Sequence, residues 1–520
     1  MSNQAPNPLA VPFLGVLASL QLIDPTVANT ALVKAAAALH LQGSSLALAA
    51  SISTLAQAAT VLLMGFLGDR LGRRPVLMAS LLLSIAGDGL ALTASGPGLF
   101  LLGRALVGIG VGAVLALTFA AVRFVSRPEQ LGKALGIWNL LIIAGFIAGS
   151  LLGGVLADSS WRLALALVPL IALVCLPLIP LLLPEMPANR ELRADWPGLI
   201  SIAAAMVLFL SGVSHAVSGF TSAQFLIPTF GGVAVFVVHL WIERQRQQPI
   251  FPVALYSRGL FAAAIVSGIA WNFAQAVVQL QTSNFWQTVQ RYSTSQVALA
   301  QLPLLLCFAG GGVLAGRLMQ PGRRTLQLMA GGLITLVLGL VLLVGVRAGA
   351  SYATFVLPLL LVGSGLAFIS VPQSALFVQE APERYFGSVT AFRTTTGQLG
   401  FALGFAASGA MVNGFGFASL RQRLLQLGAS PAQIPALEAK VRAALSSGVL
   451  GAGHGSSGSV AHSKALTVIA QAYASGLAGT MIVVALLVAL LGAISLLLLV
   501  IGHQQQAADQ VAASGAGSQL

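Results

Sequence analysis

Apolar residues follow one another in long runs along this chain, and Gly, Pro or charged residues separate the runs. Each run is long enough to cross a hydrocarbon layer of about 30 Å as a helix that rises 1.5 Å per residue. The pattern predicts an all-α polytopic membrane protein. Its fourteen expected transmembrane helices lie near residues 9–32, 45–66, 75–95, 98–121, 133–156, 162–183, 197–217, 223–242, 259–283, 295–318, 325–346, 353–377, 387–411 and 474–501.

The composition excludes a water-soluble protein. Hydrophobic residues make up 57 % of the 520 residues and charged residues only 8 %, against roughly 25 % charged residues in a typical soluble domain. The net charge of +13 comes from basic residues scattered between the apolar runs. We expect them to anchor loops at a membrane surface, and we expect no nucleic-acid partner.

The distribution of Lys and Arg predicts the orientation in the membrane. The even-numbered connections between runs hold fifteen of these residues, whereas the short odd-numbered connections hold four. Because cytoplasmic loops carry the excess of basic residues, the even connections and both termini are expected in the cytoplasm. The excess of Arg over Lys and the abundance of Ala and Gly favour a bacterial plasma membrane.

One odd-numbered connection, residues 412–473, is far longer than the others. Ser430 and Pro431 resemble a helix N-cap and first helical position before an amphipathic stretch, and residues 451–459 form a Gly/Ser-rich segment. One interpretation is a surface helix that rests on the outer leaflet. The other is a lid or a docking site for a partner.

An internal repeat predicts the domain organisation. The stretch 65–74 (GFLGDRLGRR) returns in a decayed form at 312–324, eight spans later. Two six-helix halves fit this offset only if two additional spans lie between them. We therefore expect an N-terminal bundle at 1–190, two additional helices with a linker at 191–258, a C-terminal bundle at 259–502 and a cytoplasmic tail at 503–520.

Several stretches resemble one known family. Residues 65–74 match the loop signature of the major facilitator superfamily, and residues 22–32 (LIDPTVANTAL) are similar to the first-span pattern of its fourteen-span drug–proton antiporters. Residues 104–110 and 145–154 resemble the fourth-span and fifth-span patterns of that family, although Ser150 replaces the usual proline. The resemblance implies the major facilitator fold, two six-helix bundles plus two extra central helices, and proton-driven drug efflux.

Three ionisable residues are expected at one depth, roughly 20 Å from the cytoplasmic side: Asp24, Asp88 and Arg104. Charges at such depth are costly and usually pair or face a wet cavity. One interpretation makes one Asp the proton carrier, while Arg104 keeps the other carboxylate ionised. The other interpretation is a static ion cluster that locks three helices together.

The signature loop offers a candidate conformational latch, whose charges bridge helix ends in one state and release them in another. Its residues are Gly65, Asp69, Arg70, Gly72, Arg73 and Arg74. The competing interpretation is a positive anchor at the membrane surface. The antiporter-motif helix contributes a stripe of small residues that permits close helix packing, namely Gly145, Gly149, Gly153 and Gly154.

The last six spans contain no central acid, and neutral polar or aromatic residues stand there instead. With two residues of the fifth span, they form the candidate substrate cavity: Trp138, Asn139, Trp271, Asn272, Gln275, Gln279, Gln373 and Arg393. Amides in a cavity bind varied ligands without fixing a charge. The alternative is hydrogen bonding between helices, worth about 0.6 kcal/mol per contact.

These observations predict a proton-coupled secondary transporter that exports lipophilic or amphiphilic, cationic compounds by alternating access. The alternative is a carrier of the same superfamily for a lipid or metabolite, working as an exporter or as a proton symporter. No nucleotide-binding loop occurs, so the energy is expected from an ion gradient. An enzyme, a cofactor and a metal site are not expected, and the partners are a lipophilic substrate and the bilayer around a monomer.

Overall fold

The computed structural model describes residues 7–41, 44–186, 188–191, 195–215, 221–246, 253–319, 323–382, 386–426, 430–439 and 460–517. Every regular element in this part of the chain is a helix. The first six long helices are α1 (Ala10–Leu39), α2 (Ser44–Leu71), α3 (Arg73–Thr93), α4 (Pro97–Val125), α5 (Leu131–Ser159) and α6 (Trp161–Leu182). The next are α7 (Trp196–Ser214), α8 (Ala223–Gln245) and α9 (Gly259–Thr288).

The remaining elements complete the second half of the chain. They are the short α10 (Thr294–Ala300), α11 (Leu302–Leu318), α12 (Arg323–Val344), α13 (Ala353–Glu380), α14 (Phe386–Gln426) and α17 (Val460–Gly517). Two short 3-10 helices, η1 (Pro128–Gln130) and η3 (Val253–Ser257), precede α5 and α9. Within the described residues, thirteen helices are long and apolar enough to cross a membrane. The apolar α11, with 17 residues, takes the place of the remaining expected span.

The tenth expected span, 295–318, is not one continuous helix. It breaks at Gln301 into α10 and α11. Pro303 stands in the first turn of α11, where its missing N–H is tolerated and its ring prevents a continuous helix. The Gln301 side chain donates hydrogen bonds of 3.0 Å to the Gln279 carbonyl and 2.6 Å to Ser283 Oγ. These two bonds hold the residue between α10 and α11 against α9.

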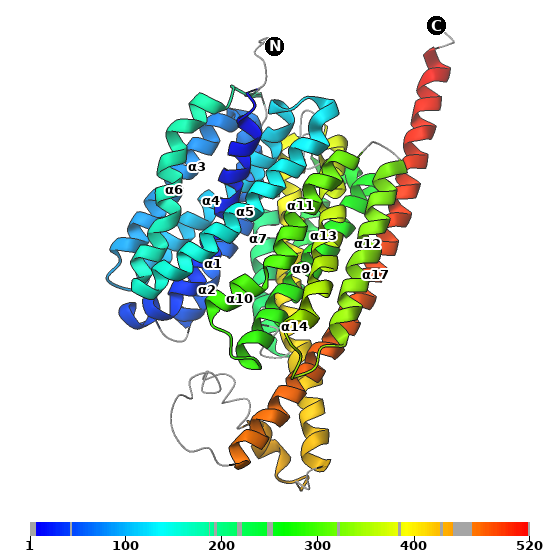
Figure 1. Cartoon of the computed structure of the whole chain (residues 1–520). Coiled ribbons are helices and arrows are strands. Elements are labelled where there is room, and N and C mark those ends of the chain that lie inside the picture. Colours follow the sequence, from blue (N-terminus) through cyan, green and yellow to red (C-terminus); the bar gives the residue numbers. More distant parts are fainter. Residues whose placement is uncertain are drawn as a thin grey trace.

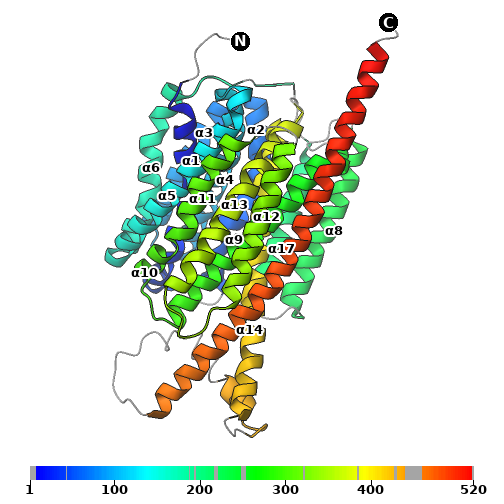
Figure 2. The same cartoon turned by 45° about the vertical axis from the view of Figure 1, so that its right-hand side comes forward.

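The long helices run side by side, and the start of α1 and the end of α17 lie at the same end of the bundle (Figure 1). We call it the terminal end. Helices α1 to α6 form one side of the molecule, and α9 and α11 to α14 with α17 form the other (Figures 1 and 2). Helix α7 packs against α2 and α14, one from each half, while α8 packs on α7. The two additional helices therefore join the halves at one flank.

The predicted long loop 412–473 and tail 503–520 are largely helical, which corrects the sequence-based boundaries. Helix α14 continues to Gln426, and α17 starts at Val460 and runs to Gly517. Both helices project beyond the bundle at the end opposite the termini (Figure 1). There, Arg423 donates a 2.6 Å hydrogen bond to Gln471 Oε1 between them. Hydropathy predicts which residues cross the membrane. A helix can continue beyond the membrane where the following residues favour the helical conformation.

The predicted helix start at Ser430 and Pro431 is also wrong. Residues 431–433 form a turn, and the helix covers only 434–439 of the described residues. The Ser430 N–H bonds to the Gln433 side chain at 3.2 Å, and the Gln433 N–H bonds to the Ser430 carbonyl at 2.9 Å. These bonds close a turn, and the helix begins only after Gln433, whose carbonyl accepts from the Leu437 N–H. The Gly/Ser-rich segment 451–459 lies outside the described residues.

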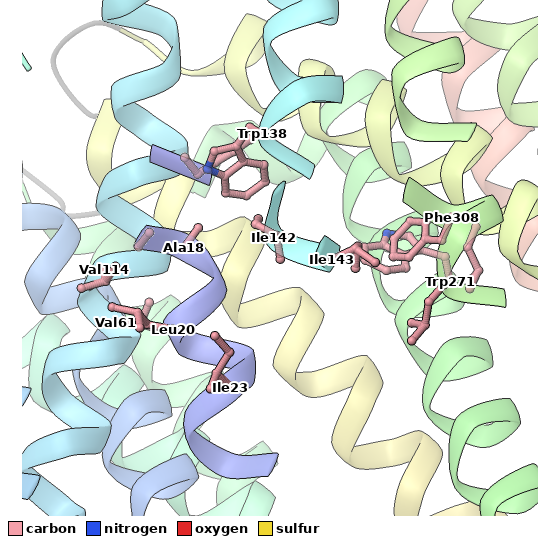
Figure 3. Packing of buried hydrophobic residues seen from close by; sticks show 14 of the residues in the cluster. Ala18, Leu20, Ile23, Val61, Val114, Trp138, Ile142, Ile143, Trp271 and Phe308 are labelled. Atoms are coloured by element: carbon pink, nitrogen blue, oxygen red, sulfur yellow. The ribbon is translucent and has the colours of Figure 1, made fainter. Parts of the chain in front are cut away.

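The two halves meet along α5 and α11, close to the terminal end. A Cβ on Gly136 would lie 2.7 Å from the Gly312 carbonyl oxygen, so the two backbones are in direct contact there. Near the same end, Arg123 of α4 donates a 3.4 Å hydrogen bond to the Val378 carbonyl of α13. Figure 3 shows Ile142 and Ile143 on α5, together with Trp271 and Phe308 from the second half. The interface is thus packed with backbone and apolar side chains.

Candidate functional site

The three ionisable residues expected at one depth form one buried cluster. Arg104 of α4 binds both carboxylate oxygens of Asp24 of α1, at 2.7 and 2.8 Å. Its Nη1 also lies 3.5 Å from Asp88 Oδ1 of α3. The exposed fractions are 2 % for Asp24, 1 % for Asp88 and 2 % for Arg104. The structure therefore brings all three predicted residues together in a site shielded from the surroundings.

Glycines at the helix crossings bring these side chains together. Gly87 and Gly103, each one residue before Asp88 and Arg104, stand where α3 and α4 cross. A Cβ on Gly87 would lie 2.8 Å from the Gly103 carbonyl oxygen. Small residues permit such close approach of helix backbones in a membrane. The sequence thus places the acid and the arginine directly beside the closest contact of their helices.

A serine that the sequence analysis missed completes the cluster. Ser53 of α2 donates a 3.1 Å hydrogen bond to Asp24 Oδ2. Its backbone packs against Gly108 of α4, where any Cβ would collide with the Ser53 carbonyl. Serine is common in apolar helices, so Ser53 itself carries no signal in the sequence. The signal is Gly108, four residues after Arg104, because a glycine there lets α2 pack closely against α4. Asp24 thereby receives three hydrogen bonds, two of them from a guanidinium.

The two carboxylates have unequal surroundings. Asp24 is held by Arg104 and Ser53, whereas Asp88 has only the single long contact of its Oδ1. Among the described residues, Asp88 Oδ2 is buried and has no hydrogen-bond partner. One guanidinium balances one carboxylate, so the second negative charge would be uncompensated in a medium where this costs several kcal/mol. A single proton on Asp88 makes the cluster neutral.

The signature loop is a tight helix–helix corner. Gly65, Asp69 and Arg70 belong to the end of α2, Arg73 and Arg74 begin α3, and Gly72 alone connects them with a φ of +94°. Such a φ favours glycine, which explains why the signature needs it at this position.

Asp69 and Arg73 are buried and form an ion pair inside this corner. The Arg73 guanidinium also lies 4.4 Å from the centre of the Phe124 ring of α4. The Asp69 carbonyl accepts a 2.8 Å hydrogen bond from the Asn189 N–H, after α6. These contacts fasten the corner inside the first half of the molecule. The predicted role as a latch stays a prediction.

The glycine stripe of α5 lies against α1. Gly145, Gly149 and Gly153 face Ser19, Ile23 and Val27 in turn, and a Cβ on Gly149 would lie 2.6 Å from Ile23 Cγ1. The close packing expected from this motif is therefore present. Gly154 differs, because a Cβ there would meet nothing within 4 Å. The stripe fixes the helix that carries Asp24 against the helix that faces the second half.

A second intramembrane arginine lies where the halves meet. Arg393 of α14 places its guanidinium 4.6 Å from the centre of the Phe119 ring of α4 and 5.4 Å from that of Trp138 of α5. Its Nε donates a 2.8 Å hydrogen bond to Ser374 Oγ of α13. Unlike Arg104, it keeps part of its surface accessible. Among the described residues, no carboxylate forms an ion pair with it.

The aromatic contacts do not balance the charge of Arg393. A cation–π contact contributes up to about 2 kcal/mol when it is desolvated. Removing an ion from water without a counter-ion costs several kcal/mol. Phe119 and Ser374, which hold this arginine, were not found from the sequence, because a phenylalanine and a serine in apolar spans carry no distinctive signal. The result is a cation held in place by neutral groups.

The amide side chains expected in the cavity lie on or beside α9. Gln373 donates a 3.1 Å hydrogen bond to the Ala264 carbonyl, and Asn272 a 2.8 Å bond to the Gly268 carbonyl, so both amides bond to the α9 backbone. Gln275 is buried, and Gln279 on the same helix is partly exposed.

Trp271 packs against Phe308 with ring centres 5.9 Å apart, and it lines a cavity of about 10 Å³ among α9, α12, α13 and α17. That cavity lies inside the second half. The hydrogen bond from Gln373 of α13 to α9 agrees with the alternative interpretation, in which amides fasten helices, whereas the bond of Asn272 lies within α9.

Comparison with known families agrees with this architecture. The family model described as Major Facilitator Superfamily matches residues 14–405, which is most of the chain. The chain belongs to the major facilitator superfamily. The chain is therefore a multi-pass membrane protein of a transporter family.

Two relatives show what kind of transporter the chain is similar to. Puromycin resistance protein pur8 of Streptomyces alboniger is 27 % identical over 78 % of this chain and 82 % of its own length. Multidrug resistance protein Stp of Mycobacterium tuberculosis (strain CDC 1551 / Oshkosh) is 27 % identical over 73 % of this chain and 71 % of its own. Both are named for drug resistance.

A solved structure confirms the fold. The human organic anion transporter MFSD10 superimposes with a TM-score of 0.57 at 17 % identity, covering 94 % of this chain and 100 % of that one. At this identity, the likeness concerns the fold alone. The prediction of the major facilitator fold from the signature loop is therefore confirmed.

Proposed function

We propose that this protein is a proton-coupled exporter of lipophilic compounds that works by alternating access. The observation that carries the proposal is the buried cluster of one arginine and two carboxylates, of which only one is balanced. The relatives named for puromycin and multidrug resistance support drug-like cargo. We propose a bacterial plasma membrane as its location, with both termini in the cytoplasm, as the distribution of Lys and Arg favours.

Asp88 carries the proton in this proposal, and Asp24 remains ionised. The Asp24 carboxylate forms a bidentate pair with Arg104 and accepts a hydrogen bond from Ser53. Asp88 lacks comparable partners in the described residues, so a proton on its Oδ2 removes an uncompensated charge. When the proton leaves, Asp88 and Asp24 compete for the same guanidinium. Protonation of Asp88 thus changes whether Arg104 binds mainly to α1, through Asp24, or also to α3, through Asp88.

The proton site reaches the interface between the halves through two helices. Asp24 lies on α1, and α1 packs along the glycine stripe of α5. Helix α5 then contacts α11 of the second half, backbone against backbone. A shift of α1 that follows a change in the Arg104 ion pairs would therefore reach the contact that closes the terminal end. This is a bistable element of the kind that alternating access requires.

The charge of the cargo is a separate question. The resemblance to drug–proton antiporters favours a cationic compound, which would require a carboxylate on the substrate path. The carboxylates described at mid-depth gather around Arg104, so Asp88 is the acid that could hold such a cation. Competition between a cation and a proton at Asp88 would couple the two fluxes directly.

A pH-gradient assay in inverted membrane vesicles tests the proposal. Puromycin, ethidium and an anionic lipophile are added separately after the vesicles have built up a gradient. We expect at least one compound to dissipate the gradient with wild-type protein, and none to do so with Asp88→Asn present at the same level. Glu129→Gln serves as a matched control, since it also neutralises one carboxylate, at an exposed position in η1. Equal dissipation by wild type and Asp88→Asn would contradict the proton assignment.

A further inference from the structure

The unbalanced arginine between the halves has no role in the proposed proton step. We infer that Arg393 binds the anionic group of the substrate, and that the substrate class is an amphiphilic organic anion, such as an aromatic carboxylate or sulfonate. The inference rests on the proposed function in one respect, since it takes the interface between the halves as the substrate path. It replaces the expected cation with an anion.

The arginine is held with one edge available. Ser374 accepts the hydrogen bond of Nε, and the Phe119 and Trp138 rings lie beside the guanidinium, 5.5 Å from each other. Among the described residues, the two Nη groups make no hydrogen bond to protein, and the side chain remains partly accessible. A guanidinium presents a planar fork of donors that matches a carboxylate or sulfonate. The adjacent rings offer an apolar surface for the lipophilic body.

The surroundings contain donors without acceptors. The Trp138 indole N–H and the Asn139 amide nitrogen, neighbours on α5, are buried and lack partners among the described residues. Glu380, an acid at the terminal end of α13, lies 3.7 Å from Arg258 in an ion pair of its own. A site whose cation has no carboxylate partner among the described residues, and that also offers a spare donor, selects a ligand that supplies negative charge and acceptors.

The anion site and the proton site are separate in depth. Arg393 stands seven residues from the start of α14, about 10 Å from the terminal end, and Asp88 fifteen residues into α3, about 22 Å. A cationic substrate that occupied the interface near Arg393 would meet a like charge. An anion there neutralises the arginine while the cation–π contacts between the halves loosen. Substrate binding is thereby linked to the contact that must open.

The class of substrate changes the electrical character of transport. One proton entering in exchange for one monovalent anion leaving moves two positive charges inward, so the exchange responds to membrane potential. One proton exchanged for one monovalent cation moves no net charge. The two substrate classes therefore differ in a property that can be measured without knowing the natural substrate.

Equilibrium binding to the purified full-length protein tests the inference. The probes are 1-naphthoate, its uncharged analogue 1-naphthamide, and the cation ethidium, with affinity measured by scintillation proximity or by competition. We expect wild-type protein to bind 1-naphthoate at least tenfold more tightly than 1-naphthamide. Arg393→Gln should lose this preference, and Arg393→Lys should retain part of it. Arg347→Gln, the same charge change at an exposed position, should keep it in full.

Each other outcome overturns the inference. Wild-type protein that binds 1-naphthoate no better than 1-naphthamide, or that prefers ethidium, contradicts an anion site. An undiminished preference in Arg393→Gln contradicts the assignment to this residue. The wild-type comparison and Arg393→Lys decide the question if Arg393→Gln does not fold. Binding of 1-naphthoate needs no pH gradient. If wild-type protein binds 1-naphthoate as expected but no compound dissipates the pH gradient in the vesicle assay, the proposed proton coupling is overturned and the anion site is not.

Discussion

Arg104 and Arg393 are both intramembrane arginines, and the protein treats them in opposite ways. Arg104 joins α1, α3 and α4 within the first half and is enclosed by two carboxylates. Arg393 belongs to the second half, contacts aromatic rings of the first, and has no acidic partner among the described residues. One guanidinium has more negative charge around it than it can balance, and the other is paired with no carboxylate in the part of the chain that the structure describes.

This contrast indicates what each half contributes. An excess of carboxylate is relieved by a proton, and an unbalanced cation is relieved by an anion. We propose that the first half contains the group that the proton gradient acts on, and that the second half contains the group that binds the substrate. The two meet through α1, α5 and the interface, as alternating access requires. Substitutions at Arg104, at the acids, at the glycine stripe and at Arg393 test this contrast, and we expect their effects on stability to decrease in that order.

Replacing Arg104 should have the largest effect on stability. Arg104→Met leaves Asp24 and Asp88 buried together without a cation, and breaking a buried ion pair in this way typically costs about 3 to 5 kcal/mol. We expect a large drop in the midpoint of thermal unfolding in detergent micelles, and no transport. The triple variant Arg104→Met with Asp24→Asn and Asp88→Asn should recover most of the midpoint. A midpoint unchanged by Arg104→Met would show that the cluster does not stabilise the fold.

The two acids of the cluster should differ in the same assay. Asp24→Asn removes the carboxylate that Arg104 and Ser53 hold, and the charge-assisted hydrogen bonds lost are worth about 1.5 to 3 kcal/mol. Asp88→Asn removes one long contact of 3.5 Å and leaves the fold nearly as stable as wild type. Equal losses for both variants would contradict the unequal surroundings of the two carboxylates.

The glycine stripe should connect the cluster to the interface by close packing. Gly149→Ala adds a Cβ that would lie 2.6 Å from Ile23, and overpacking of this kind costs about 1 to 3 kcal/mol. Gly154→Ala, five residues along the same helix, adds a Cβ to open space and should not destabilise the protein. Thermal unfolding of the pair measures the difference. Loss of transport in Gly149→Ala with the cluster intact would support the route through α1.

Replacing Arg393 should have the smallest effect on stability. Arg393→Met gives up the contacts to Phe119, Trp138 and Ser374, but it also removes a partly buried charge that has no counter-ion among the described residues. Exchange of a buried ion for an apolar side chain is often neutral or stabilising. We expect a change within about 1 kcal/mol, far below that of Arg104→Met. A loss as large as that of Arg104→Met would point to an acidic partner.

Much of this architecture follows from the sequence. Apolar runs and the position of the signature loop predict the spans, the two halves and the pair of additional helices, because a bilayer demands about twenty apolar residues per crossing. The depth of Asp24, Asp88 and Arg104 follows from counting residues along helices. Their meeting was therefore predictable, and the glycines next to Asp88 and Arg104 agree with it.

Other features depend on contacts between distant residues, which the sequence does not encode locally. The partners of Arg393 come from three helices, and its separation from any described acid is a property of the assembled interface. Similarly, the unequal hold on Asp24 and Asp88 depends on Ser53, which only the crossing of α2 and α4 brings near. The predicted bounds of α14 and α17 were wrong because hydropathy indicates which residues lie in the bilayer, whereas both helices continue beyond it.

The assignment of the proton to Asp88 is the central claim, and one measurement tests it directly. Purified wild-type and Asp88→Asn protein are reconstituted in liposomes, and the probe is a compound that the wild-type protein binds and transports. Two fluxes are measured: exchange of the probe across the membrane without a pH gradient, and accumulation of the probe driven by a pH gradient. The account predicts that Asp88→Asn retains exchange and loses the gradient-driven accumulation. Gradient-driven accumulation at the wild-type level in Asp88→Asn would contradict it.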